Sequence, residues 1–216
     1  VMDTLPFFSC RYLFATVLWV EKYKNWLSNV NVIVVKSSDI ERMSQLTTPT
    51  QVLAVYEIPQ YTFDEAKLST NLVLALDRIQ DPGNLGTIMR IADWFGIKDI
   101  LCSSGTVDVY NPKVVRASQG MMFHLPIITR NTKEFIEELK TKDYKIVGTK
   151  VTNGHDVRES SIYSHFALVI GNEGQGMSQD IETLCDEYLY IKMNGNCESL
   201  NASVATAIIV FEAVKQ

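Results

Sequence analysis

The sequence predicts an α/β fold built on a mostly parallel sheet. Short apolar runs in residues 71–216 alternate with helical patterns, which is the arrangement that gives parallel strands. The expected strands are Leu72–Leu76, Asp99–Cys102, Lys145–Thr149, Ala167–Ile170 and Tyr188–Ile191. With 216 residues, 46% of them hydrophobic, the chain can bury one core, or one core and a small appended domain.

Residues 1–59 are expected to form a separate small α/β domain. Pro59 ends its last strand, because proline lacks the N–H group that a strand ladder needs. The polar segment 60–70 is predicted to be a linker with one short helix, which leaves residues 71–216 as the main domain. The expected elements of the small domain are a mixed or helical segment over Cys10–Trp26, a buried strand over Val30–Val35, a short helix over Ser38–Met43 capped by Ser38 or Asp39, and a strand over Gln51–Ile58.

The charge balance limits the classes of partner. The formal net charge of −5 argues against a protein that coats nucleic acid nonspecifically, since phosphate neutralisation dominates that kind of affinity. A local basic face is compatible with this charge, and an ordinary solvated surface is an equally open explanation for each basic residue. The candidates for a basic face are Arg90, Lys113, Arg116, Arg130, Lys133, Lys150 and Arg158.

Cysteine usage and hydropathy favour a cytoplasmic protein without a metal site or a membrane segment. The four cysteines are scattered with no CxxC pair, so the pattern favours neither zinc ligands nor a disulfide framework. The longest apolar runs, such as Ile208–Phe211, are far shorter than the roughly 20 residues that cross a bilayer. The start of the chain lacks a basic leader with a cleavage site, so no signal peptide is expected.

The first motif of chemical interest follows the strand Leu72–Leu76. The segment Asp81-Pro82-Gly83-Asn84 is a turn, and Asn84 is expected to cap the helix that follows. Arg90 and Trp94 lie off the apolar face of that helix, and periodicity alone favours a surface role for the arginine. The apolar face, which is expected to be core, consists of Leu85, Ile88, Met89, Ala92 and Phe95.

The second motif begins at Gly171, directly after an apolar strand. Gly171 can bring bare backbone close to a ligand, and Gly174 and Gly176 are expected to adopt left-handed backbone angles. The glycine order is G-x-x-G-x-G and differs from the dinucleotide order G-x-G-x-x-G, so it is a weak nucleotide signature. A plain strand-to-helix turn explains the isolated segment equally well. Glu173 in this loop could accept hydrogen bonds from an arginine or from backbone.

The third motif lies between the last strand and a C-terminal helix. After Ile191 and Met193 the chain turns through Asn194-Gly195-Asn196, and a helix is expected to begin near Ser199. Ser199 and Asn201 could be no more than caps of this helix, which is the favoured explanation for the isolated segment. The helix face expected to pack into the core consists of Leu200, Val204, Ala207, Ile208 and Phe211.

Together the three motifs resemble the SpoU/TrmH branch of the SPOUT RNA methyltransferases. The resemblance covers residues 71 to 216, while residues 1–59 are more loosely similar to the small L30e-like substrate-binding domain of many members. It implies a parallel sheet with a deep trefoil knot in the C-terminal part, and commonly a homodimer with sites near the subunit interface. The matching residues are Asn84, Gly86 and Arg90, then Gly171, Glu173 and Gly176, then Ser199, Leu200 and Asn201.

The same resemblance implies an S-adenosylmethionine-dependent 2′-O-ribose methyltransferase acting on RNA, with ribosomal RNA favoured over transfer RNA. Arg90 would lie at the ribose 2′-hydroxyl, either as the base or as a group that holds the phosphate and orients the hydroxyl. The second role suits a guanidinium pKa above about 12 better. The residues expected to serve catalysis are Asn84, Arg90, Glu173, Ser199 and Asn201, and those expected to hold the cofactor are Thr149, Gly171, Asn172, Ile191, Met193, Gly195 and Leu200.

Three other functions stay open at this point. A noncatalytic RNA-binding protein of the same fold is disfavoured by the intact set Arg90, Glu173, Ser199 and Asn201. A Rossmann-like oxidoreductase is disfavoured by the glycine order. Base methylation by a related SPOUT branch is the nearer competitor, and those branches carry different motifs.

Overall fold

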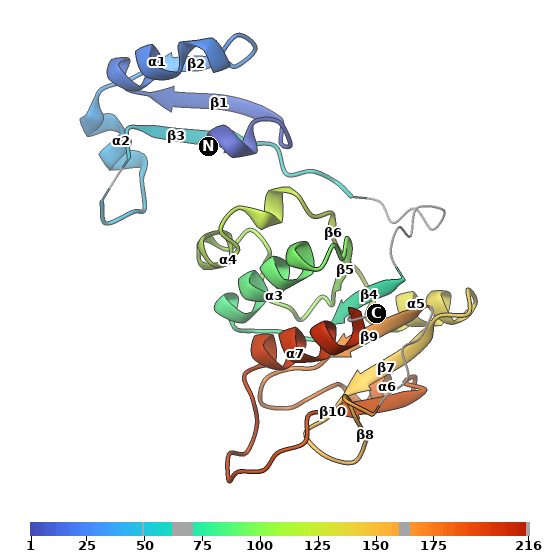
Figure 1. Ribbon diagram of the computed structural model, residues 1–216. Coiled ribbons are helices and arrows are strands. Elements are labelled where there is room, and N and C mark those ends of the chain that lie inside the picture. The colour runs from blue at the N-terminus through green and yellow to red at the C-terminus, as the bar shows by residue number, and fades with distance from the viewer. Residues whose placement is uncertain (49, 62–70, 160–164, 215–216) are drawn as a thin grey trace. The chain divides into compact units, whose positions relative to one another are not determined.

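The computed structural model describes residues 1–48, 50–61, 71–159 and 165–214. The chain divides into two compact units, Val1–Gln60 and Tyr61–Gln216 (Figure 1). The predicted linker over residues 60–70, with its short helix, lies largely outside the described residues.

The smaller unit is a three-stranded sheet in the order β2-β1-β3, with β2 parallel and β3 antiparallel to β1. The side chains of Leu13, Ala15, Trp19 and Leu27 form its core. Its elements are η1 Met2–Thr4, β1 Cys10–Ala15, α1 Val17–Tyr23, η2 Lys24–Trp26, β2 Val32–Val34, α2 Ser37–Met43 and β3 Val52–Tyr56.

Two expectations for the smaller unit were wrong in detail. The strand near Val30–Val35 exists but is not buried: Ile33 is 36% and Val34 is 55% exposed, and among the described residues β2 is an edge strand paired with β1. The cap of α2 is Lys36, not Ser38 or Asp39. The Asp39 carboxylate instead accepts a hydrogen bond from the Lys36 backbone N–H at 3.0 Å, as an acidic residue in the first turn of a helix commonly does.

The larger unit is built on a seven-stranded sheet in the order β6-β5-β4-β9-β7-β10-β8, and its strand pairs are parallel. This confirms the predicted α/β class. The central strands β4 and β9 are buried along their whole length, as their unbroken apolar sequences require. The strands are β4 Leu72–Leu76, β5 Asp99–Cys102, β6 Ile127–Thr129, β7 Lys145–Thr149, β8 His155–Asp156, β9 Phe166–Ile170 and β10 Glu187–Tyr190.

Helices cover both faces of this sheet (Figure 1). Side chains at alternate positions of β4 enter different cores: Leu74 packs with residues of α3, α4 and α7, whereas Val73 and Ala75 pack with residues of α5 and α6. The two cores therefore follow from the period-two alternation of a strand. The helices are α3 Pro82–Trp94, α4 Pro112–Ala117, η4 Met121–Phe123, α5 Thr132–Lys140, α6 Gln179–Glu182 and α7 Ala202–Val214.

Helix α3 follows the predicted pattern except at its start. Its expected core residues Leu85, Ile88, Met89 and Ala92 are buried, and Phe95 packs against the same core. Asn84 is not the N-cap, because the cap is Asp81, whose Oδ1 accepts a hydrogen bond from the Asn84 N–H at 2.8 Å. Pro82 then occupies the first turn, where its missing N–H costs nothing. The side chain of Asn84 is therefore available for other contacts.

The C-terminal helix α7 differs from its prediction in start and in orientation. It begins at Ala202, three residues after the expected Ser199. The apolar face expected to enter the core is largely exposed, including Leu200, Val204 and Phe211, whereas Ala207 and Ile208 are half-buried. The buried side chains of the helix are Ser203, Thr206, Ile209 and Val210.

Small side chains explain this orientation. Helix α7 packs along α3, and the two helices lie side by side in Figure 1. Thr206 is fully buried. Its hydroxyl donates to the Ala202 carbonyl at 2.7 Å, so the burial leaves no unpaired polar atom in the core. The predicted face was wrong because a pattern of apolar spacing cannot choose between two faces that are both able to be buried.

No described helix has both the length and the apolar composition of a membrane span. In the described ranges the four cysteines are free, and no group of His, Cys, Asp and Glu is arranged to hold a metal ion. Burial raises the pKa of the Cys102 thiol to about 12, so this cysteine behaves as a packed hydrophobic residue.

Candidate active site

Three loops that follow strands β4, β9 and β10 carry the three sequence motifs. Because the strands are parallel, their carboxyl ends lie at one edge of the sheet, which is where ligands bind in open α/β sheets. Contacts among these three loops therefore form the candidate site.

Hydrogen bonds link one residue of each motif into a chain. The Asn201 Nδ2 donates to Asn84 Oδ1 at 2.7 Å, and the Asn84 Nδ2 donates to Glu173 Oε1 at 2.9 Å. Asn84 is only 6% exposed, and these two neighbours satisfy both the oxygen and the nitrogen of its buried amide. Segments separated by 89 and 117 residues are in this way held in one arrangement.

Asn201 also caps helix α7. Its Oδ1 accepts hydrogen bonds from the Ser203 N–H at 3.0 Å and the Val204 N–H at 3.3 Å, and from the Ser203 hydroxyl at 2.6 Å. The capping role and the link to Asn84 use different atoms of one amide, so the cap expected from the sequence is confirmed and the same side chain also contacts the first motif. Ser199, in contrast, lies before the helix and does not cap it.

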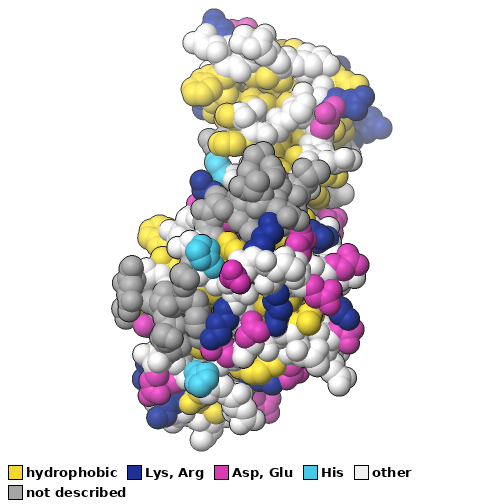
Figure 2. All heavy atoms as spheres, turned by 90° about the vertical axis from the view of Figure 1, so that its right-hand side faces the viewer, with side chains coloured by type: hydrophobic (Ala, Val, Ile, Leu, Met, Phe, Trp, Pro, Cys, Tyr) yellow, Lys and Arg dark blue, Asp and Glu magenta, His cyan; other side chains and the backbone are white. Residues whose placement is uncertain are grey.

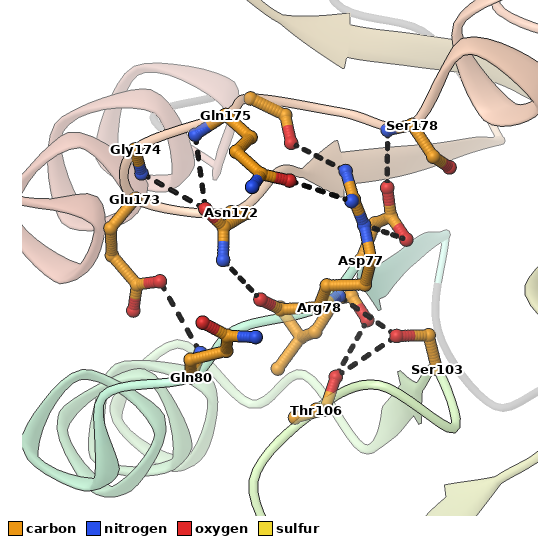
Figure 3. Close-up of polar contacts among 12 residues, drawn as sticks. Asp77, Arg78, Gln80, Ser103, Thr106, Asn172, Glu173, Gly174, Gln175 and Ser178 are labelled. Atoms are coloured by element: carbon orange, nitrogen blue, oxygen red, sulfur yellow. Dashed lines mark hydrogen bonds and ion pairs between the residues drawn. The ribbon is translucent and has the colours of Figure 1, made fainter.

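The Glu173 carboxylate lies at the N-terminal end of α3. It accepts a hydrogen bond from the backbone N–H group of Gln80 at 3.3 Å (Figure 3). It also accepts from the Asp81 N–H at 3.2 Å and from the Asn84 amide. Partial burial alone would raise the pKa of Glu173, but these donors outweigh it and hold the pKa below its usual value. Glu173 therefore remains an anion that organises the loop after β4.

A cavity of about 570 Å³ opens beside these loops. This volume lies within the range of roughly 300–1,000 Å³ that is usual for pockets binding small molecules. The segments after β7, β9 and β10 line it, together with the start of α7. It includes every residue expected from the sequence to hold a cofactor except Gly195: Thr149, Gly171, Asn172, Ile191, Met193 and Leu200.

Of the residues expected to serve catalysis, Glu173 and Ser199 line the cavity. Asn84 and Asn201 do not line it and belong to the hydrogen-bonded chain described above. Arg90 is exposed on α3 and is not a lining residue, so the structure does not bring it to this cavity within one chain.

Glycine geometry shapes the wall formed by the loop after β9. A Cβ atom on Gly171 would lie 2.3 Å from the Met177 backbone nitrogen, so only glycine allows the loop to close on itself here. Gly176 has φ +69°, in the left-handed region, whereas Gly174 does not, which corrects the expectation for that residue. Asn172 and Gly176 close the loop with reciprocal backbone hydrogen bonds of 2.9 Å.

A charged pair in the cavity was not identified from the sequence. Lys150 pairs with Glu182, and the Lys150 Nζ lies 3.9 Å from the centroid of the Tyr188 ring. The hydrogen bond that the Lys150 ammonium donates to the Glu182 carboxylate is the main cause of a raised pKa for Lys150. No sequence signal could have indicated this pair, because the two residues come from different elements and belong to no motif.

The proposed basic face is partly neutralised. Arg130 pairs with Glu138 at 2.9 Å, Arg158 pairs with Asp156 at 2.6 Å, and Lys150 pairs as described. Figure 2 shows Lys and Arg side chains interspersed with Asp and Glu over one side of the molecule. The members without an ion pair among the described residues are Arg90, Lys113, Arg116 and Lys133.

Residues 71–211 match the SpoU rRNA Methylase family. This range contains the three motifs, the cavity and the hydrogen-bonded chain that joins the loops. The chain belongs to the SpoU rRNA methylase family. The resemblance stated from the motifs is thereby confirmed.

Two curated relatives illustrate the match. The chain is 40% identical over 170 residues to the 23S rRNA (guanosine(2553)-2′-O)-methyltransferase RlmP of Bacillus subtilis, covering 78% of this chain and 66% of that protein. It is 38% identical over 202 residues to a putative TrmH family tRNA/rRNA methyltransferase of Staphylococcus saprophyticus, covering 88% of this chain and 80% of the relative. The chain thus spans slightly less than two thirds of the first relative and four fifths of the second.

A solved structure agrees in fold. The S-adenosylmethionine-bound rRNA methyltransferase from Sinorhizobium meliloti has a TM-score of 0.87 and 28% sequence identity, covering 99% of this chain and 83% of the other. The parallel α/β sheet of the larger unit is therefore a SpoU methylase fold. The cavity in the present chain has apolar walls and exposed backbone at glycines. Its size and chemistry suit S-adenosylmethionine.

Proposed function

We propose that this SpoU family member transfers a methyl group from S-adenosylmethionine to the 2′-hydroxyl of a ribose in RNA. The observation that carries the proposal is the hydrogen-bonded chain Glu173–Asn84–Asn201, which lies beside a cavity lined by the residues expected to hold the cofactor. The names of the relatives, which are RNA methyltransferases, support the same reaction class.

In this proposal the cavity holds S-adenosylmethionine. Its apolar lining, including Ile191, Leu200 and Ile209, suits an adenosine ring, and the bare backbone at Gly171 allows close approach. The bound cofactor supplies a methyl group activated by the positive charge of its sulfonium. Gly195 is assigned a place in the turn after Met193 and not a lining position.

The protein residues mainly align the ribose hydroxyl with the methyl group. The ribose oxygen attacks the methyl carbon, the carbon–sulfur bond breaks, S-adenosylhomocysteine leaves and the hydroxyl proton passes to solvent or a basic group. Arg90 is assigned to the target phosphate and hydroxyl, which a planar guanidinium can bind with two parallel hydrogen bonds. Ser199 is assigned to the ribose side of the cavity, while Glu173, Asn84 and Asn201 hold the loops in register.

A homodimer accounts for the position of Arg90. Helix α7 leaves Val204 at 47% and Phe211 at 49% exposed, and Trp94 on the neighbouring helix α3 is 84% exposed. Exposed apolar side chains gathered on adjacent helices are typical of a surface covered by a partner subunit. We place Arg90 of one subunit at the cavity of the other, across this surface.

The finer features of the fold belong to the same proposal. A trefoil knot in the C-terminal part is supported by membership of the family and by the strand order β4-β9-β7-β10. We assign the catalytic domain to residues 71–216, a linker to residues 60–70, and a small substrate-binding domain of the L30e type to residues 1–59. The mixed α/β architecture of the smaller unit supports this last assignment.

The proposed substrate is ribosomal RNA of the large subunit. Support comes from the Bacillus subtilis relative, whose name specifies a guanosine of 23S rRNA. Transfer RNA is the competing substrate, because the Staphylococcus saprophyticus relative is named for both classes.

The test is methyl transfer from labelled S-adenosylmethionine to total RNA taken from a host that lacks this protein. Nucleoside mass spectrometry identifies the product, with separated ribosomal and transfer RNA as parallel substrates and Arg90→Ala as the inactive control. A 2′-O-methylnucleoside in 23S rRNA that requires Arg90 is expected. A base-methylated product, or none in any RNA fraction, would contradict the proposed reaction.

A further inference from the structure

Arg78 has an unusual backbone conformation for a residue with a side chain. It is the second residue after β4 and has φ +59°, in the left-handed region that favours glycine. Such a conformation costs free energy and persists only where the surrounding contacts hold it in place. The contacts of Arg78 therefore indicate what the strained backbone achieves.

The Arg78 guanidinium binds the loop after β9. Its Nη1 donates to Gln175 Oε1 at 3.1 Å and its Nη2 donates to the Gly176 carbonyl at 3.2 Å (Figure 3). Its Nε lies 3.6 Å from Oδ1 of the buried Asp77, within ion-pair distance. The planar fork presents the donors for Gln175 and Gly176 in fixed directions, whereas a lysine ammonium is a compact charge on a flexible stem.

The backbone of Arg78 binds the same loop from the other side. Its carbonyl accepts a hydrogen bond from Asn172 Nδ2 at 2.8 Å. The Oδ1 of that asparagine accepts from the N–H groups of Gly174 and Gln175, both at 3.0 Å. Figure 3 shows Asn172 between the Arg78 carbonyl and these two N–H groups. The orientation of the Asn172 amide, and with it the shape of the loop, is thus set from residue 78.

Asp77 and Ser103 also help attach the loop after β4 to the loops after β9 and β5. The Asp77 Oδ2 accepts from the Ser178 N–H at 2.6 Å, and the Ser103 hydroxyl accepts from the Arg78 N–H at 2.8 Å. Gly105 leaves room for the arginine stem, since a Cβ atom on Gly105 would lie 2.8 Å from Arg78 Cγ. Three loops at the carboxyl edge of the sheet therefore meet at one arginine.

The loop that Arg78 holds is a wall of the cavity. Residues 170–177 line it, but Arg78 does not. We propose that Arg78 is a positioning residue for S-adenosylmethionine, which fixes the loop after β9 in the form that binds the cofactor. The inference rests on the proposed function, because it names a determinant of the cofactor site assigned there.

Arg78→Gly separates positioning from stability. Glycine adopts φ +59° without strain, so the backbone cost disappears while both guanidinium hydrogen bonds are lost. We expect thermal stability close to that of the wild type, but a dissociation constant for S-adenosylmethionine raised by about tenfold, as for the loss of charge-assisted bonds that pre-organise a loop. Arg78→Lys keeps the charge and should raise it by only about threefold.

The dissociation constant is measured by titration calorimetry with S-adenosylmethionine on the full chain, and thermal unfolding is recorded for each variant. Arg130→Ala is the matched control, because the Arg130 side chain is 32% exposed against 31% for Arg78 and also forms an ion pair. This control should bind the cofactor as the wild type does. In methyl transfer, Arg78→Gly should raise KM for S-adenosylmethionine about tenfold and leave kcat within about twofold.

Wild-type affinity in Arg78→Gly, or a lowered kcat with unchanged KM, would overturn the positioning role while methyl transfer by the wild type stands. A wild-type chain that binds no S-adenosylmethionine would overturn the proposed function, and the positioning role with it.

Discussion

Replacing Asn84 by alanine tests whether the hydrogen-bonded chain between the three motifs holds the site together. The substitution removes the donor at 2.9 Å from Glu173 and the acceptor at 2.7 Å from Asn201. Both partners remain in place, because each has other hydrogen bonds: Glu173 to two backbone N–H groups, and Asn201 to the start of α7. The variant should therefore fold, with loops that are less firmly held.

The expected loss of stability is modest. The bond from Asn201 contributes about 1 kcal/mol, as a typical neutral hydrogen bond does. The bond to Glu173 contributes only about 0.5 kcal/mol, because this carboxylate is exposed and solvent screens it. Alanine recovers about 0.5 kcal/mol of helix propensity within α3. The net decrease in the free energy of unfolding is about 1 kcal/mol, or a shift of roughly 2–4 °C in Tm.

The decrease in the free energy of unfolding caused by Asn84→Ala should depend on pH. The donors around Glu173 hold its pKa below the usual value of 4.5, so the stability they contribute is present above that pH and is lost as the pH falls through the lowered pKa. The difference between wild type and Asn84→Ala should therefore be largest near neutral pH and smaller below about pH 4. Urea unfolding of both proteins at the two pH values measures it.

Activity should fall much further than stability. Misalignment of the loops that carry the reacting groups typically reduces the rate by about a hundredfold, so methyl transfer should decrease by at least about tenfold. Thr87→Ala in the same helix is the control, since it changes propensity and no hydrogen bond among the described residues joins Thr87 to Glu173 or Asn201. If Asn84→Ala transferred methyl groups at the wild-type rate, the reasoning that these contacts assemble the site would be refuted.

Three further predictions concern the cavity, the target hydroxyl and the subunit interface. Gly171→Ala places a Cβ atom 2.3 Å from the Met177 nitrogen, so binding of S-adenosylmethionine in calorimetry should weaken by more than about tenfold; unchanged binding would show that the loop can move. Arg90→Lys should be nearly as inactive as Arg90→Ala with unchanged cofactor affinity, and near-normal turnover would rule out bidentate binding. Phe211→Asp should convert a wild-type dimer to a monomer in sedimentation experiments, and a monomeric wild type would refute the proposed interface.

The sequence predicted the central sheet well because its strands are short apolar runs bounded by turns. The bounds of β4, β5 and β7 agree with the expected ranges. The start of β9 and both ends of β10 differ from the expected positions by one residue. Helix starts were harder to predict. Both Asp81 and Asn84 can cap a helix, and the choice between them depends on Pro82 fitting the first turn.

The site was predictable only in part, for a related reason. Motifs indicated Asn84, Glu173 and Asn201 separately, but their mutual hydrogen bonds join positions 89 and 117 residues apart along the chain. Arg78 belonged to none of the expected site residues. Its importance depends on a positive φ and on contacts with a loop 97 residues away, neither of which leaves a local pattern in the sequence.

The wrong prediction for α7 contains information about assembly. A helix that covers a sheet in a single chain needs one apolar face, and its other face is normally polar. Helix α7 buries Ile209 and Val210 inside the chain, yet it also carries Val204 and Phe211 on its exposed side. A helix that is apolar all round is typical of a helix covered from both sides. Val204 and Phe211 stay exposed in the single chain, so the prediction that they enter its core was wrong. In the proposed homodimer a second subunit would cover these two side chains.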